Sequence, residues 1–95
     1  MIKHIVMWKF KEGTEKEMNE FLSGLKGLYG QIDALKALEI GVSVNPDDNN
    51  YDAVMISEFE SLEGLKAYKT DPRHVKVSSL CKSIRTDRGS VEFEF

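Results

Sequence analysis

Residues 68–77, YKTDPRHVKV, divide the C-terminal half of the chain and carry its most reactive side chains. Asp71 is a favoured residue at the start of a helix, and Pro72 suits the first helical position because its φ is preset and it has no N–H to lose. The residue before a proline is also disfavoured in the α conformation. The segment therefore predicts two helices that meet at Asp71, with Tyr68 closing one helix and His74 in the first turn of the next.

Tyr68 and His74 are the candidate acid and base of the chain. Across a helix break, a phenol and an imidazole at this spacing can face a common space. A position near the positive end of the helix dipole favours the neutral form of His74, and a neutral imidazole can accept a proton. The spacing equally allows a structural arrangement, in which a half-buried His74 bonds a backbone carbonyl beside a core tyrosine.

Four other segments have the alternating pattern of β-strands. Residues 2–10 and 51–59 carry apolar side chains on both faces, whereas residues 35–44 and 90–95 alternate apolar with polar or small side chains. A strand that is apolar on both faces is expected to be covered on both. We therefore expect the first and third strands to lie at the centre of a covered sheet.

Helices are predicted between these strands. Thr14 followed by Glu17 has the spacing of a capping box, and apolar residues then recur at helical spacing to about residue 29 or 30. Ser61 is expected to cap the second helix and Pro72 to begin the next. The resulting order, βαββαβ, predicts an α+β, ferredoxin-like fold with a four-stranded antiparallel sheet and helices on one face. Right-handed crossovers place the first and third strands at the centre, and residues 1–95 form one domain.

The sheet face away from the helices is expected to need a partner. Its apolar side chains in the two central strands are Ile5, Met7, Val54 and Ile56. Two copies packed sheet to sheet would bury both sets, so the pattern predicts a homodimer with these residues at the interface.

Composition excludes several classes of partner and cofactor. A formal net charge of −3 and a pI near 5.4 leave no basic footprint for nucleic acid or an anionic membrane surface. The apolar run at residues 2–10 is too short to span a bilayer. The single Cys81 cannot form an internal disulfide, which fits a reducing, cytoplasmic location. Neither metal-ligand spacing nor a glycine-rich phosphate loop is present, so we expect no metal and no organic cofactor.

Three stretches in register resemble one known family. HIVMWKFK at residues 4–11, YDAVMISEFES at 51–61 and AYKTDPRHVKV at 67–77 are similar to the stress-responsive dimeric α+β barrel (Dabb) domain, and with the element order the resemblance covers essentially the whole chain. It implies a dimeric α+β barrel formed by two sheets, with a pocket between sheet and helices in each subunit. A plant polyketide cyclase of this family closes an aromatic ring by an aldol step without metal or organic cofactor. The resemblance implies catalytic roles for His4, Tyr68 and His74, with His74 as the base and Tyr68 as its acid partner or substrate orienter, while Ala53 stands where that enzyme has a further pocket histidine.

The expected pocket is apolar with a few polar groups. We expect His4, Tyr68 and His74 to surround one cavity whose walls are Trp8, Phe10, Ala53, Met55 and Phe59. Such a cavity suits an aromatic or aliphatic ligand with one polar end. These inward side chains can also be ordinary core.

The resulting functional hypothesis is a protein that binds a small apolar or aromatic molecule, with cofactor-free acid–base chemistry of the aldol-cyclisation, lyase or isomerase type. A non-catalytic stress-response or binding protein is the main alternative. A cofactor-free monooxygenase is a weaker one, because it rests on fold analogy alone.

Overall fold

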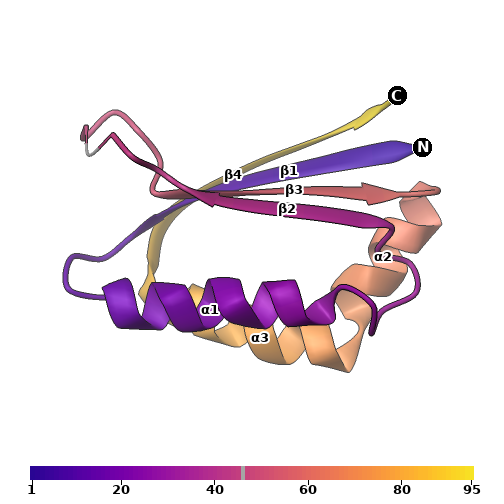
Figure 1. Ribbon diagram of the computed structural model, residues 1–95, viewed down its shortest axis with the longest axis horizontal. Helices are drawn as coiled ribbons and strands as arrows, with labels where there is room; N and C mark the ends of the chain where they lie inside the picture. The colour runs from indigo at the N-terminus through magenta and orange to yellow at the C-terminus, as the bar shows by residue number, and fades with distance from the viewer. Residues whose placement is uncertain (46) are drawn as a thin grey trace.

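The computed structural model describes residues 1–45 and 47–95, and its elements follow the predicted order, including the predicted division of the last helix at Asp71. They are β1 (Ile2–Phe10), α1 (Glu15–Leu28), β2 (Ala37–Val42), β3 (Ala53–Phe59), α2 (Leu62–Thr70), α3 (Pro72–Ile84) and β4 (Arg85–Glu94). The strands form one antiparallel sheet in the order β2-β3-β1-β4. In Figure 1, α1 and α3 run along one face of this sheet and α2 lies near one end. The ferredoxin-like α+β fold with β1 and β3 at its centre is thereby confirmed.

The helix boundaries follow from local capping. The Ser61 hydroxyl accepts a hydrogen bond from Gly64 N, and the Asp71 carboxylate accepts one from Arg73 N, so both predicted caps form. Pro72 occupies the first turn of α3, as expected. None of the helices in the described ranges is long and apolar enough to cross a membrane.

The capping box predicted at the start of α1 is wrong. The Thr14 side chain makes no cap hydrogen bond, and its hydroxyl instead donates to the carbonyl of Lys11 in the preceding turn. Gly13, with φ +79, makes that turn and places Thr14 so that its hydroxyl faces back along the chain. The helix also ends at Leu28, slightly earlier than residue 29 or 30.

The strand boundaries differ from the sequence patterns at several ends. The structure begins β3 at Ala53 and confines β2 to Ala37–Val42, so both strands are shorter than predicted. The largest difference is β4, which begins at Arg85 instead of residue 90. Its first residues pair with β1 through their backbone, placing Arg88 opposite Trp8. Backbone pairing of this kind does not require the alternation of apolar and polar side chains from which strands are predicted.

The core lies between the sheet and the two long helices. Apolar side chains of α1 pack against those of β1 and β3, and the most deeply buried of them are Val6, Leu25, Met55 and Phe59. A Cβ atom at Gly24 of α1 would lie 3.1 Å from a methyl group of Val77 in α3. A glycine here therefore lets the two helices approach closely, which fixes the spacing of the layer below the sheet.

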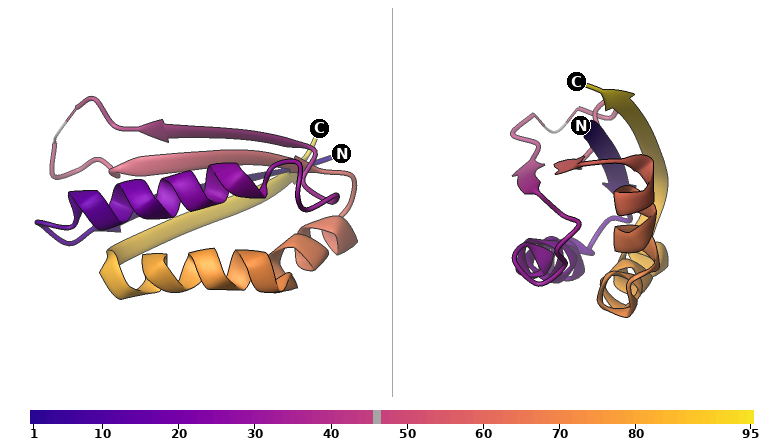
Figure 2. Two further views of the ribbon diagram at one scale, coloured as in Figure 1. Left: turned by 60° about the horizontal axis from the view of Figure 1, so that its bottom comes forward. Right: turned by 90° about the vertical axis from the view of Figure 1, so that its right-hand side faces the viewer.

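The other face of the sheet is uncovered in the single chain. The end-on view in Figure 2 shows both long helices beneath one face, with none on the other. Strand pairing places Ile5 opposite Ile56 and Met7 opposite Val54, so these apolar side chains are adjacent on that face. Phe93 of β4 remains 44% exposed. The predicted interface residues thus form one continuous apolar surface.

Candidate functional site

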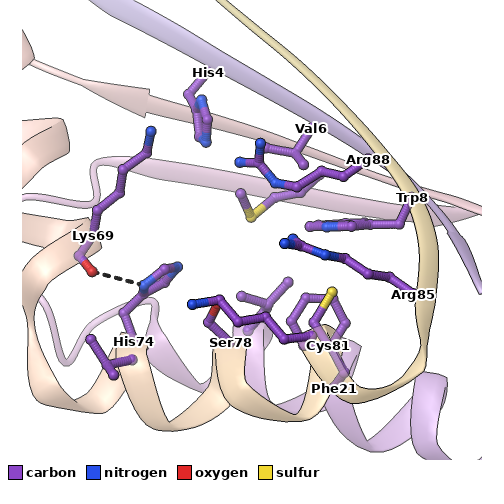
Figure 3. A pocket seen from close by; sticks show the side chains of 14 residues that line it. His4, Val6, Trp8, Phe21, Lys69, His74, Ser78, Cys81, Arg85 and Arg88 are labelled. Carbon is purple, nitrogen blue, oxygen red and sulfur yellow. Dashed lines mark hydrogen bonds between the residues drawn. The ribbon is translucent and has the colours of Figure 1, made fainter.

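A cavity of about 310 Å³ lies between the helix-facing side of the sheet and helices α1, α2 and α3 (Figure 3). Its volume is near the lower end of the range for small-molecule pockets, and a cavity of roughly 150 Å³ already holds benzene. The cavity can thus hold one aromatic ring with a short substituent. Apolar side chains form part of its wall, namely Val6, Trp8, Phe21, Leu25 and Met55.

The structure brings some of the predicted site residues to this cavity and keeps others away. His4, Trp8, Met55 and His74 line it. The remaining four predicted residues, Tyr68, Phe10, Ala53 and Phe59, are not among its lining residues.

Packing explains where three of these side chains, Phe59, Phe10 and Ala53, lie. Phe59 is fully buried against Tyr68, with ring centroids 5.2 Å apart. Phe10 stacks on Trp8 at 6.4 Å, on the side of that indole nearer the start of α1. Ala53 pairs with Trp8 across the β1–β3 ladder, and its small side chain does not extend to the cavity. All three belong to the core that supports the cavity.

His74 presents one ring nitrogen to a backbone acceptor. Its Nδ1 lies 3.2 Å from the carbonyl oxygen of Lys69 (Figure 3). A carbonyl can only accept, so Nδ1 carries a proton, and in a neutral ring Nε2 is the atom with the lone pair. Burial lowers the pKa of His74, as does the nearby Lys69 charge, while the hydrogen bond to the Lys69 carbonyl opposes them. The side chain is therefore neutral near pH 7, with Nε2 able to accept a proton.

Tyr68 packs against His74 but does not share the cavity surface with it. The two ring centroids are 4.5 Å apart. Tyr68 is fully buried, and its hydroxyl lies 3.9 Å from Met55 Sδ, a weak acceptor. Burial raises the pKa of the Tyr68 hydroxyl, so it stays protonated and able to donate. The structure thus brings the phenol and imidazole rings together while directing the hydroxyl towards Met55.

His4 lies on the wall opposite His74 in Figure 3 and is 2% exposed. Its Nδ1 is 3.5 Å from Glu92 Oε2, yet it has no hydrogen bond among the described residues. Burial lowers the pKa of His4 to about 4; the Lys69 charge acts in the same direction, and Glu92 opposes both. His4 is consequently a neutral, buried imidazole whose Nδ1 has no hydrogen-bond partner among the described residues, an unusual state for a polar atom in a protein core.

Sequence reasoning missed the charged part of the site. Lys69, Lys82, Arg85 and Arg88, which we call the cationic cluster, also line the cavity. None of the described residues that line it is acidic. Two members lie in the part of β4 that sequence alternation did not identify as strand; the polar run RTDRG at residues 85–89 was the available signal. In residues 1–45 and 47–95, no group of three or more His, Cys, Asp or Glu side chains is placed to hold a metal ion.

Comparison with known proteins extends over nearly the whole chain. The family model described as the stress responsive A/B barrel domain (Dabb) matches residues 2–95. A stress-response A/B barrel domain-containing protein of Arabidopsis thaliana is 35% identical over 85 residues, which are 86% of this chain and 75% of that protein. Olivetolic acid cyclase of Cannabis sativa is 31% identical over 86 residues, 87% of this chain and 85% of the cyclase. The crystal structure of a dimeric protein of unknown function with a ferredoxin-like fold from Bacteroides fragilis has a TM-score of 0.90 at 28% identity, covering 99% of this chain and 95% of that one.

Proposed function

Since this chain belongs to the stress-responsive A/B barrel (Dabb) domain family, we propose that its cavity binds a small aromatic or aliphatic molecule and that His74 abstracts a proton from it without a cofactor. The observation that carries the proposal is the placement of His74 on the cavity wall with Nδ1 held by the Lys69 carbonyl. That hydrogen bond fixes the tautomer in which Nε2 is the base. The likeness to olivetolic acid cyclase supports an aldol cyclisation, or a related lyase or isomerase reaction, as the class of chemistry.

The proposed step is proton abstraction next to a carbonyl group. His74 Nε2 takes a proton from the carbon adjacent to the carbonyl, and the electron pair of the C–H bond moves to form an enolate. In a substrate with a second carbonyl, the enolate carbon attacks it and forms a carbon–carbon bond. The imidazolium then returns its proton to the new alkoxide, so His74 ends the cycle neutral. Burial, which lowers the His74 pKa, keeps the base unprotonated at neutral pH.

Tyr68 and His4 have supporting roles in this proposal. Tyr68 holds the His74 ring in place through direct packing. Among the described residues its hydroxyl contacts only the Met55 sulfur, so a substrate oxygen would be a better acceptor once the flexible Met55 side chain moves aside. His4, on the opposite wall, orients a polar group of the ligand through its imidazole ring.

We also propose that the protein acts as a homodimer through the uncovered sheet face. Ile5, Met7, Val54 and Ile56 form an apolar surface that a second copy would bury. The similar Bacteroides fragilis protein is described as dimeric, which supports the same arrangement here.

The base can be tested without knowing the physiological substrate. Acetophenone carries an enolisable methyl ketone on one ring, a size that suits the cavity. In D₂O, the protein is expected to accelerate exchange of its methyl protons, followed by NMR. His74→Ala should reduce that rate by roughly 10² to 10⁴-fold, the usual contribution of a positioned base. Lys76→Gln, an exposed change on the same helix, is the matched control.

Binding is measured separately, through the fluorescence of Trp8, the only tryptophan and a cavity residue. Full exchange activity in His74→Ala contradicts the base assignment. Binding by the unmutated protein with no exchange at all favours a non-catalytic binding protein, the second candidate function. That candidate draws support from the direction of the Tyr68 hydroxyl, which faces Met55.

A further inference from the structure

We propose that the ligand of this cavity carries a carboxylate, and that Arg85 and Arg88 bind it while the apolar body lies against Trp8 and its neighbours. The inference rests on the proposed function and specifies its substrate class as small aromatic or aliphatic carboxylates. Three features of the site support it. They are the positive charge of the cavity lining, the bulge that turns Arg85 and Arg88 to the same face, and the lack of carboxylate partners for these two arginines among the described residues.

The charge of the cavity wall is opposite to that of the chain. The chain has a formal net charge of −3, yet four of its 13 lysines and arginines line this one cavity. No acidic side chain of the described residues accompanies them on the lining. Like charges gathered around a partly apolar space repel one another, and an anion held between them relieves that repulsion.

A β-bulge directs both arginines into the cavity. Arg88 pairs with Trp8 on the helix-facing side of the sheet, and strict alternation would place a residue three positions earlier on the opposite face. The register shifts between Lys9 and Phe10, so that Arg85 pairs with Phe10 and returns to the helix-facing side. Bulges commonly redirect a side chain in this way next to functional sites. Figure 3 shows both side chains extending from β4 towards the cavity.

The arginines of the cationic cluster have no carboxylate partner in the part of the chain that the structure describes. Arg88 donates to the hydroxyl of Ser90 at 3.2 Å, and no ion pair involves Arg85 or Arg88 there. Arg73, outside the cavity, shows the contrasting arrangement, with its guanidinium bound to Asp71 through Nε and Nη2. Arg73 is thus neutralised within the fold, whereas the half-buried Arg85 and the exposed Arg88 on the cavity lining remain available to a ligand.

The donor set favours a carboxylate over a neutral polar group. A guanidinium presents parallel N–H groups that match the two oxygens of a carboxylate, and such charge-assisted pairs are the stronger hydrogen bonds in proteins. Lys69 lies 3.8 Å from Glu92, so its charge is partly satisfied, and Lys82 offers a single ammonium instead of two parallel donors; the arginines are therefore the principal binding groups. The cavity of about 310 Å³ accommodates a single ring with a carboxylate, and its apolar wall excludes a fully hydrated anion.

Two probes of the same shape test the inference. They are 4-acetylbenzoate and the neutral 4-acetylbenzamide, with dissociation constants measured from Trp8 fluorescence at low and high salt. The benzoate is expected to bind about tenfold to hundredfold more tightly than the amide, the range of a charged hydrogen-bonded pair, and less tightly as salt rises. The double variant Arg85→Gln, Arg88→Gln should abolish that preference. Lys66→Gln with Lys76→Gln makes the same change in net charge at exposed positions outside the cavity and should preserve it.

The outcomes separate this inference from the proposed function. Equal binding of the two probes, or an unchanged preference in the double arginine variant, overturns the inference and leaves the binding cavity intact. Displacement of the benzoate by inorganic phosphate at equal concentration also overturns it, because the site would then recognise any anion. If neither probe perturbs Trp8 at millimolar concentration, the binding cavity itself is refuted and the inference falls with it.

Discussion

His4 should make the stability of the fold depend on pH in a way that one substitution can isolate. The ordinary histidine pKa is 6.5, and burial lowers that of His4 to about 4 in the folded protein. Between these two pKa values the unfolded chain binds a proton at His4 that the folded chain does not bind, so the free energy of unfolding decreases as pH falls. The difference of about 2.5 in pKa corresponds to about 3 kcal/mol of unfolding free energy at 1.36 kcal/mol per unit, and roughly 2 kcal/mol of it is lost by pH 5.

Urea denaturation at pH 7 and pH 5, followed by Trp8 fluorescence, measures this loss. Gln at position 4 is polar and of similar size but does not titrate, so His4→Gln should lose about 2 kcal/mol less than the unmutated protein over the same interval. His74 and the carboxylates other than Glu92, which lies 3.5 Å from His4, are common to both proteins, and their contributions cancel in the comparison. If the substitution lowers stability equally at pH 7 and pH 5, both unfolding free energies of the variant decrease and the difference between them is unchanged. Equal losses in the two proteins would refute the account of His4 as a buried neutral imidazole.

Three further predictions concern catalysis and assembly. Because burial lowers the His74 pKa, the rate of acetophenone proton exchange should fall at low pH with a midpoint below the ordinary histidine pKa of 6.5; a midpoint near pH 8 would identify a different base. In Tyr68→Phe, the Met55 sulfur is the one acceptor among the described residues that loses a hydrogen-bond donor, so stability should change by less than about 1 kcal/mol and the exchange rate by less than tenfold. A loss of exchange as large as that of His74→Ala would instead make the hydroxyl essential. Val54→Asp should convert the dimer to monomer in sedimentation experiments, because burying an unpaired charge costs several kcal/mol. Val44→Asp, at a 99% exposed position, should leave the dimer intact. A monomeric unmutated protein would contradict the interface.

The fold was predictable because several local signals agreed. Residues 2–10 and 51–59 are apolar on both faces and became the two central strands, and the break at Asp71-Pro72 formed as its sequence indicates. The site was less predictable, because spacing places a side chain on a face without fixing its torsion angles. Tyr68 and His74 are neighbours as expected, yet the Tyr68 hydroxyl faces a methionine sulfur instead of the cavity.

The cationic cluster could not be predicted from alternation. Residues 85–89, RTDRG, lack the apolar pattern of a strand and form one only because β1 supplies backbone partners across the sheet. The bulge between Lys9 and Phe10 then decides which side chains of this segment face the helices. Neither the pairing nor the bulge leaves a periodic signal in the sequence, so the charges that we assign to ligand binding emerged only from the structure.

The most direct test of the central claim is a crystal structure of the protein with 4-acetylbenzoate bound. We expect the carboxylate on Arg85 and Arg88, the ring against Trp8, and the acetyl methyl carbon about 3 to 3.5 Å from His74 Nε2, the distance of a reactive arrangement. A ligand bound outside this cavity, or bound within it with His74 Nε2 directed away from the acetyl group, would contradict the claim that His74 is the base of this site.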